Sequence, residues 1–306
     1  MLTSTLAPIV LFTYKRLDTL QFTVESLKRN PLATGSILYI FSDSPKNSSD
    51  REQVHQVRQY IRSIHGFREI HIEEAKHNLG LATSVINGVT SILKIHDQII
   101  VLEDDLLLAP NFLDFMNQSL RLYERSKEVF SISGFSFNFR SPVHYHYDGY
   151  FLTRGWSWGW ATWKDRWDKI DWQIADYPVF SKNKKLQKQF SGGGSDLNAM
   201  LKKQITGKLD SWAILWLYNQ FRRSGLTYYP LVSRVSNNGF DNNATHTKTF
   251  QSRFRTILDQ SNNSNFRHPD IILKSNDFQS QLQKKMGLVS RSISKIETSL
   301  NFLLKR

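Results

Sequence analysis

The chain is 306 residues long and carries 40 Lys and Arg, 27 Asp and Glu and no Cys. This length allows one large domain or two ordinary ones, and the absence of Cys excludes disulfide scaffolds, Cys-ligated zinc and thiol catalysis. Hydrophobic residues make up 40% and charged residues 22%, which is typical of globular and not of disordered proteins. No apolar run approaches the roughly 20 residues of a membrane-spanning helix, and no signal-peptide cleavage pattern follows the first residues. We therefore expect a cytoplasmic protein.

The formal net charge of +13 is concentrated in two parts of the chain. Residues 1–180 are nearly neutral, with a net charge of −1, and residues 209–280 carry +3. Residues 181–208 hold seven Lys against one Asp, and residues 281–306 hold six basic residues against one acidic residue. Because the part with the clearest fold signal is neutral, we expect no nucleic-acid partner.

Short apolar strands alternate with amphipathic helices in the first half of the chain. The expected strands span residues 8–13, 36–41, 70–72, 98–102 and 129–133. Between them, apolar residues recur every three or four positions, as in Leu17, Leu20, Val24 and Leu27. This alternation predicts an α/β fold with a mostly parallel central sheet flanked by helices, in which ligands bind at the carboxyl edge of the strands.

The second half has a different composition. Residues 150–172 hold six of the eight Trp and are expected to form an aromatic-rich loop region. Residues 181–208 combine Lys and Gln with a run of three Gly, a composition that predicts a mobile, solvated connection. A helix is expected to begin near Asp210, and a turn at Asn237–Gly239.

Three adjacent carboxylates, Glu103, Asp104 and Asp105, follow the expected strand 98–102 directly. Such groups repel one another unless a cation neutralises them, and a hard divalent ion with oxygen ligands does this well. The other interpretation is an acidic strand end that caps the helix beginning near Asn111. The place at the carboxyl edge of a central strand favours the metal.

Polar residues also follow the other expected strands. Thr13 and Arg16 end the first strand, where Arg can contact a phosphate or simply be solvated. Asp43 follows the second strand and can accept hydrogen bonds from a base or a ribose hydroxyl, although Ser-Asp-Ser-Pro is also good turn chemistry. In Asn78-Leu79-Gly80 the backbone can approach a ligand closely at the glycine, although a lone Asn-x-Gly pattern is weak evidence.

The Trp-rich segment interleaves Trp156, Trp158 and Trp160 with Gly155 and Gly159. Both glycines would weaken a regular strand or helix, so the pattern predicts a shaped loop. Exposed Trp faces stack on sugars, whereas buried ones fill a core. We expect about half of these indoles to serve packing.

Asp210 and His246 are two further candidates in the second half. Asp210 stands where a helix begins, so it is either an N-cap or a functional carboxylate. His246 lies in an Asn-rich loop, where it can ligate a metal or pair with a phosphate, although a lone loop His more often does neither.

Six segments, in this order, resemble the GT-A nucleotide-sugar glycosyltransferases, and within them the Golgi N-acetylglucosaminyltransferase that starts hybrid N-glycans and its bacterial relatives. The segments are PIVLFTYKR, YIFSD, IIVLEDDLLLAPNFLDF, FLTRGWSWGWATW, KLDSW and YPLVSRVSNNGFDNNATH. They span most of residues 8–246, and the EDD-containing segment is the most specific. The resemblance implies a GT-A fold with a nucleotide-sugar-binding half over 1–125, an acceptor-binding half over 126–260 and a C-terminal extension over 261–306.

The resemblance also implies roles for individual residues. Asp210 matches the catalytic base, Asp105 matches the direct Mn²⁺ ligand, and His246 falls in a loop over the nucleotide and is a second candidate ligand. The expected contacts to the nucleotide-sugar are Thr13, Arg16, Asp43, Asn78, Gly80, Glu103 and Asp104. The expected acceptor contacts are Trp156, Trp158, Gly159 and Trp160. The chain departs from the family in three places. The loop over the nucleotide has Thr245 where the family has Ser, the acceptor loop is richer in Trp, and segment 181–208 looks like an insertion. The identity of the acceptor therefore cannot be carried over from the family to this chain.

The expected function is an inverting transferase, dependent on Mn²⁺ or Mg²⁺, that moves a sugar from a UDP-sugar such as UDP-GlcNAc. The acceptor would be a hydroxyl of a glycan or lipid-linked molecule in bacterial surface polysaccharide synthesis. Two other classes stay open: a sugar-nucleotidyltransferase on a similar sheet, and a non-catalytic carbohydrate-binding protein. The first usually has a Gly-rich loop after its first strand, and Phe12–Arg16 contains no Gly.

The C-terminal residues predict a basic amphipathic helix. Its apolar stripe consists of Val289, Ile293, Ile296, Leu300 and Leu303. Within residues 284–306 basic side chains surround this stripe, as in helices that lie on anionic membranes. A helix docked on the domain, or one paired in a dimer, is the other interpretation. The membrane alternative would place the protein peripherally on the inner face of the membrane.

Overall fold

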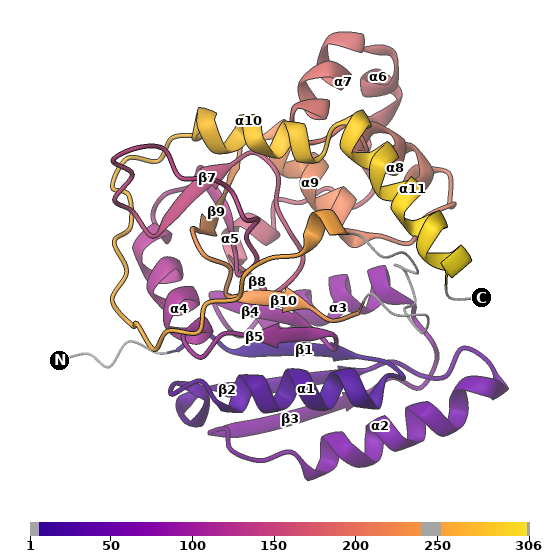
Figure 1. Ribbon diagram of the computed structural model, residues 1–306. Helices are drawn as coiled ribbons and strands as arrows, with labels where there is room; N and C mark the ends of the chain where they lie inside the picture. Colours follow the sequence, from indigo (N-terminus) through magenta and orange to yellow (C-terminus); the bar gives the residue numbers. More distant parts are fainter. Residues whose placement is uncertain (1–5, 240–251, 305–306) are drawn as a thin grey trace.

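The computed structural model describes residues 6–239 and 252–304. An eight-stranded sheet crosses the molecule in the order β3-β2-β1-β4-β8-β6-β9-β7 (Figure 1). Its strands are β1 Ile9–Thr13, β2 Ile37–Ser42, β3 Glu69–Glu74, β4 Gln98–Glu103, β6 Val129–Ser133, β7 Gly149–Leu152, β8 Trp160–Trp163 and β9 Leu226–Pro230. Only β7 and β8 run opposite to the other strands of this sheet. The predicted mixed α/β fold with a mostly parallel sheet is confirmed.

Helices flank the sheet on both faces (Figure 1). They are α1 Leu17–Lys28, α2 Arg51–Ser63, α3 Leu81–Leu93, α4 Phe112–Tyr123, α5 Lys164–Trp167, α6 Tyr177–Lys182, α7 Lys184–Phe190, α8 Leu197–Ile205, α9 Trp212–Arg222, α10 Asn276–Lys285 and α11 Leu288–Leu304. Alternate residues of β1 enter two cores, because successive side chains of a strand point to opposite faces. Ile9 and Leu11 pack with α1, α2 and α4, while Val10 and Phe12 pack with α3, α5 and α9. Burial on both faces explains why β1 is apolar throughout.

The strand register brings three polar positions to one edge of the sheet. β1 pairs in parallel with β2 and β4, and Thr13 is opposite Ser42 while Phe12 is opposite Glu103. The carboxyl ends of the three strands are therefore level. Thr13, Asp43 and Glu103 meet there, as the parallel arrangement predicted.

The Trp-rich segment is not the loop region that its composition predicted. Residues 160–163 form β8, which lies antiparallel between β4 and β6, and residues 149–152 form the edge strand β7. Aromatic residues favour strands that are packed on both faces, and all four residues of β8 are buried. The two glycines lie before this strand and do not interrupt it.

A small second sheet connects the two halves of the chain at the site edge. It pairs β5 (Leu106–Leu108) with β10 (Val235–Asn237) in antiparallel fashion, and Asn237 is opposite Leu106. The hydroxyl of Thr23 in α1 accepts a hydrogen bond from the Leu106 N–H at 3.0 Å, and that of Ser26 accepts one from the Leu108 N–H at 3.1 Å. β5 is thus held on both sides, directly after the acidic triplet.

Residues 181–208 do not form the mobile connection that was predicted. Most of them belong to α6, α7, the short 3-10 helix Ser191–Gly193 and α8, which form a helical lobe beside α9 (Figure 1). Four apolar residues hold this lobe together by packing with α9, namely Phe180, Phe190, Leu197 and Leu201. These few apolar residues are outnumbered by Lys and other polar residues, so the composition of the segment did not indicate packed helices. All seven Lys of the segment are exposed.

The C-terminal extension contains the helices α10 and α11, which confirms the predicted helical tail. α10 packs against the sheet through Phe278, whose ring stacks on Tyr150 with centroids 4.0 Å apart. In the described part of the chain, we find no helix with the length and apolar character that crossing a bilayer requires.

Candidate active site

A cavity of about 700 Å³ opens at the carboxyl edge of β1, β2 and β4. Its walls come from the segments that follow these strands, from the start of α3 and from residues 209–213 before α9. Residues predicted from the sequence that line it are Thr13, Arg16, Asp43, Asn78, Gly80, Glu103, Asp104, Asp105, Trp158 and Asp210. The fold therefore gathers most of the predicted site into one hollow. His246 lies outside the described residues.

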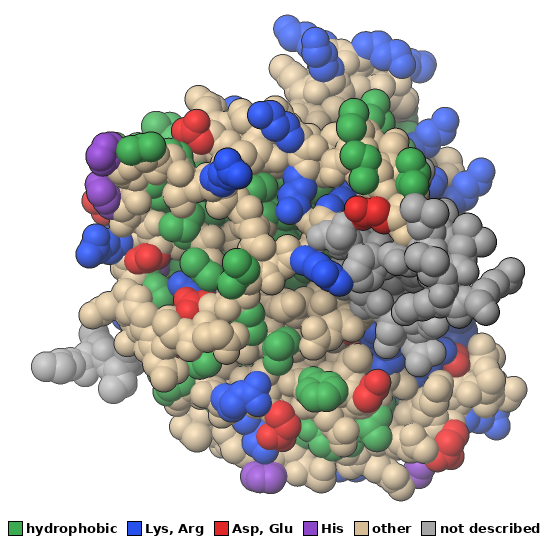
Figure 2. Space-filling view, viewed as in Figure 1, with side chains coloured by type: hydrophobic (Ala, Val, Ile, Leu, Met, Phe, Trp, Pro, Cys, Tyr) green, Lys and Arg blue, Asp and Glu red, His purple; other side chains and the backbone are tan. Residues whose placement is uncertain are grey.

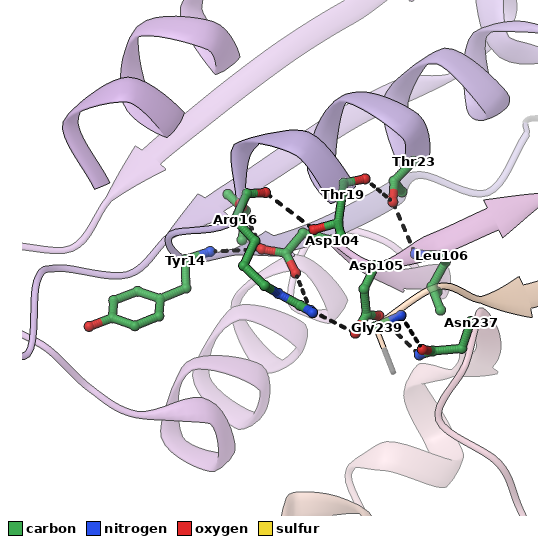
Figure 3. A network of polar contacts seen from close by, with 10 residues as sticks. Tyr14, Arg16, Thr19, Thr23, Asp104, Asp105, Leu106, Asn237 and Gly239 are labelled. Carbon is green, nitrogen blue, oxygen red and sulfur yellow. Dashed lines mark hydrogen bonds and ion pairs between the residues drawn. The ribbon is translucent and has the colours of Figure 1, made fainter. Parts of the chain in front are cut away.

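The Arg16 guanidinium lies between two of the carboxylates in this cavity (Figure 3). Its Nη2 donates to Asp105 Oδ2 at 2.7 Å and to Asp104 Oδ1 at 3.2 Å. Asp104 is buried, and its Oδ2 also accepts from the Thr13 hydroxyl at 3.0 Å and the Tyr14 N–H at 3.1 Å. Asp104 thus fastens the end of β1 to the end of β4, while Asp105 lies beside it on the cavity wall.

Residues after β10 hold Asp105 from the other side (Figure 3). Asn237 Nδ2 donates to Asp105 Oδ1 at 3.1 Å, and the Asn238 N–H donates to the Asp105 carbonyl at 2.8 Å. The Gly239 N–H donates to Asn237 Oδ1 at 2.7 Å, and a Cβ at Gly239 would collide with the Asp105 carboxylate. The sequence predicts only a turn at Asn237–Gly239, and the structure shows that this turn also holds Asp105.

The acidic triplet carries more negative charge than Arg16 can neutralise. Burial, with repulsion from Asp105 and Asp104, raises the pKa of Glu103 to about 8. Burial also raises the pKa of Asp104, although Arg16 opposes this shift. A hard divalent cation would relieve this excess charge, and carboxylate oxygens are the donors it prefers.

The donor set fits such a cation only in part. Among residues 6–239 and 252–304, no three His, Asp or Glu side chains converge as a metal site. Asp105 lines the cavity, and a cation bound to it would take further oxygens from ligand and water. This arrangement is usual for Mg²⁺ at phosphate sites.

Asp43 organises the loop before α3. Its Oδ1 accepts from the Ser44 N–H at 2.7 Å and the Leu79 N–H at 2.9 Å. Its Oδ2 accepts from Asn78 Nδ2 and from the Gly80 N–H, both at 3.0 Å. A carboxylate offers about four acceptor sites, and protein donors fill them here. Asp43 therefore shapes the cavity wall, and its contact with a nucleotide stays a prediction.

Asp210 caps a helix, but not the helix that the sequence suggested. Its Oδ2 accepts from the Leu81 N–H at 3.1 Å and the Ala82 N–H at 3.5 Å, at the start of α3. The N-cap of its own helix, α9, is Ser211. Within the described residues no hydrogen bond involves Asp210 Oδ1, and Asp210 is exposed at the cavity.

The predicted acceptor residues separate into two groups. Trp158 lines the cavity, whereas Trp156 is half-buried against Phe135 and Phe254. Trp160 is 2% exposed and stacks on Trp212 with ring centroids 4.8 Å apart, so the expected acceptor contact is wrong for this residue.

Gly159 also fails to line the cavity, and it serves the backbone instead. Its φ of +59° is the left-handed conformation that favours glycine. A Cβ at Gly159 would lie 2.8 Å from a methyl group of Val235. The glycine thus allows β8 to pass close to β10, and an acceptor contact is not its role here.

Tyr14, Lys15 and Lys46 form a basic corner of the cavity and are not among the predicted site residues. Lys15 Nζ donates to Asp50 Oδ1 at 2.7 Å, and the Tyr14 hydroxyl donates to Asp50 Oδ2 at 2.8 Å. The Tyr14 hydroxyl in turn accepts from the Lys46 N–H at 2.9 Å. Lys46 itself is exposed at the cavity. The signal for this corner was the Tyr-Lys-Arg sequence directly after β1.

Comparisons with known proteins give weak similarity. No family model matches the chain, and no curated protein matches it. Among solved structures, the mannosyltransferase PcManGT from Pyrobaculum calidifontis, in complex with GDP-Man and Mn²⁺, aligns with a TM-score of 0.36 and 9% identity over 53% of this chain and 46% of its own. S. aureus TarS aligns with a TM-score of 0.40 and 10% identity over 74% of this chain and 37% of its own. This chain spans less than half the length of either protein.

Proposed function

We propose that the protein is an inverting, divalent-metal-dependent glycosyltransferase that uses a nucleotide-sugar donor, namely a UDP-sugar such as UDP-GlcNAc. The observation that carries this proposal is that Asp105 and Asp210, on different halves of the chain, line one cavity. The ordered sequence resemblance supports the donor class. The acceptor would be a hydroxyl of a glycan or of a lipid-linked molecule in bacterial surface polysaccharide synthesis.

The charged residues around Asp105 would bind the diphosphate of the donor. Arg16 Nη1 is buried and has no hydrogen-bond partner within the described residues, so it can donate to a phosphate oxygen. Lys46 adds a second cation at the cavity wall. A Mn²⁺ or Mg²⁺ ion, held by Asp105 and donor oxygens, would neutralise the leaving diphosphate as a Lewis acid.

Asp210 would act as the general base. Its Oδ1 would accept the proton of the acceptor hydroxyl while the hydroxyl oxygen forms a bond to the anomeric carbon. The bond from that carbon to the diphosphate breaks, and its electron pair leaves with the nucleoside diphosphate. A single displacement inverts the anomeric centre, and a positioned base contributes roughly 10²–10⁴ in rate.

Trp158 is the side chain best placed to contact the sugar acceptor. It lines the cavity beside Ser157, near the residues that precede α9. An indole face can stack on the apolar face of a sugar ring. This role would separate Trp158 from Trp160, which fills the core.

The test is a screen for release of UDP from UDP-sugars, of GDP from GDP-sugars and of CMP from CMP-sugars, with Mn²⁺, with Mg²⁺ and with a chelator. We expect metal-dependent release from UDP-sugars, which Asp105→Asn abolishes. Release of pyrophosphate from a nucleoside triphosphate and sugar phosphate would instead indicate a nucleotidyltransferase. Sugar binding without turnover of any donor would indicate a carbohydrate-binding protein, and either result overturns the proposal.

A further inference from the structure

The C-terminal helix α11 is packed with its apolar side outward. Leu288, Val289, Ile293 and Ile296 are 70%, 75%, 52% and 60% exposed. Ser294, on the opposite side of the helix, is 5% exposed. A helix that only completes the fold of a soluble domain buries its apolar side instead. Among residues 6–239 and 252–304, therefore, no segment buries these four side chains of α11.

Polar contacts hold α11 on the domain in this orientation. Arg291 Nη1 donates to the Ser195 hydroxyl oxygen at 3.0 Å. The Ser195 hydroxyl donates to the Met286 carbonyl at 2.9 Å, directly before the helix. Gln279 of α10 donates to the Gly192 carbonyl at 2.9 Å, so α10 and the helical lobe are also joined. Because Arg291 belongs to α11, rotating the helix to bury its apolar side would break the contact of Arg291 with Ser195.

Basic side chains border the apolar side of α11. Lys284 lines the same hollow of about 560 Å³ as Leu288, Val289 and Ile293. Figure 2 shows hydrophobic side chains along α11 at the upper right, with Lys and Arg side chains on both sides of them. The adjoining lobe of α6, α7 and α8 adds seven exposed Lys between residues 181 and 208.

We propose that the outward side of α11, together with the Lys residues that border it, docks on an anionic lipid bilayer. The four apolar side chains would enter the boundary between headgroups and acyl chains, and the lysines would contact anionic headgroups. Charge complementarity favours this occupant over a second copy of the chain. Two copies joined through α11 would bring two regions of high positive charge together, since residues 181–208 and 281–306 carry +6 and +5. This inference does not depend on the proposed catalytic function.

The test is sedimentation of the full chain with phosphatidylcholine vesicles, with and without phosphatidylglycerol. We expect binding to the vesicles that contain phosphatidylglycerol, weakened by added salt. Replacing two outward residues together, Ile293→Ser and Ile296→Ser, should lower the partition coefficient at least about tenfold, because each buried isoleucine contributes strongly to insertion. A second pair, Leu288→Ser with Val289→Ser, should act in the same direction.

The matched control replaces two equally exposed apolar residues that precede α10, Ile271→Ser and Leu273→Ser. These residues are 71% and 70% exposed, and their replacement should leave vesicle binding unchanged. Circular dichroism checks that each variant is folded. Equal binding of the wild type to both kinds of vesicle, no binding to either, or equal binding by the α11 variants would overturn the proposal. So would a dimer in solution that the α11 substitutions dissociate without any vesicle binding by the wild type.

Discussion

The carboxylate of Asp210 accepts a hydrogen bond from the Leu81 N–H at 3.1 Å, which joins residues 129 positions apart in the sequence. Leu81 opens α3 directly after Gly80, whose N–H donates to Asp43 at the end of β2. The carboxylate before α9 is thereby fixed relative to the strand edge that carries the acidic triplet. This chain of contacts gives one rigid wall to the cavity.

Replacing Asp210 should separate its capping role from its chemical role. Asn is as good a cap as Asp, so Asp210→Asn should change the free energy of unfolding by only a few tenths of a kcal/mol, whereas Asp210→Ala should lower it by about 1 kcal/mol. Urea unfolding of the three proteins measures the difference. Equal stability of the Ala and Asn variants would show that the contact with α3 contributes nothing.

Removing the Asp43 carboxylate should loosen the loop before α3. Asp43→Ala leaves four donors without their acceptor, and we expect the free energy of unfolding to fall by roughly 2–3 kcal/mol. The control Asp168→Ala removes an exposed Asp, and its effect should stay within about 0.5 kcal/mol. If both variants unfold at the same urea concentration, the network around Asp43 is not structural.

A methyl group at position 239 should disturb Asp105 without unfolding the protein. The Cβ of Gly239→Ala would collide with the Asp105 carboxylate and lie 3.1 Å from Arg16 Nη1. Because overpacking of this kind costs about 1–3 kcal/mol, we expect affinity for UDP with Mn²⁺ to fall at least about tenfold. Calorimetric titration measures it, with Gly192→Ala as control, since a Cβ there would have its nearest neighbour at 3.8 Å. Unchanged affinity in Gly239→Ala would contradict the close packing on Asp105.

Acid should destabilise the protein partly through the ion pair of Arg154 and Asp196. Burial opposes ionisation of Asp196, yet the Arg154 guanidinium, 2.9 and 3.0 Å away, holds the pKa of Asp196 below its usual 3.8. A carboxylate with a lowered pKa in the folded state stabilises the fold above its unfolded pKa and loses this contribution as the pH falls. The loss should therefore begin near pH 4 and grow toward lower pH.

The variant Asp196→Asn tests this pH dependence. It leaves Arg154 buried without its counter-charge, and we expect a loss of about 3 kcal/mol at neutral pH. Below pH 4 its stability should fall less steeply than that of the wild type. Parallel curves of unfolding free energy against pH for the two proteins would exclude the ion pair as a source of acid sensitivity.

The sequence allowed a good prediction of the cavity edge, because that edge is built from parallel strands. Continuous apolar runs marked β1, β2 and β4, and the polar residues that follow them had to meet. The prediction of a loop over the Trp-rich segment was wrong, because the structure of this segment depends on pairing with strands distant in the sequence. Nothing local in residues 160–163 indicates that they enter the sheet beside β4, so the sequence alone predicts Trp160 as an acceptor contact, whereas the structure buries it.

Two features of the second half could not be predicted from composition, namely the helical lobe over residues 181–208 and the orientation of α11. The seven Lys of residues 181–208 suggested a solvated connection, although apolar residues such as Phe190 and Leu201 pack these short helices on α9. The C-terminal helix was predicted correctly, and Val289, Ile293 and Ile296 of its predicted apolar stripe are exposed. The sequence could not decide between membrane, domain and dimer, because spacing does not tell which side of a helix faces the domain. The buried Ser294 supplies that information.

The most direct test of the central claim is the rate of sugar transfer or donor hydrolysis by Asp210→Asn at saturating UDP-sugar and Mn²⁺. This substitution keeps the shape and the hydrogen-bonding oxygen of the side chain but cannot take up the acceptor proton. We predict a rate lower by roughly 10²–10⁴, with the affinity for the donor unchanged. A wild-type rate in Asp210→Asn would contradict the assignment of Asp210 as the base in this cavity.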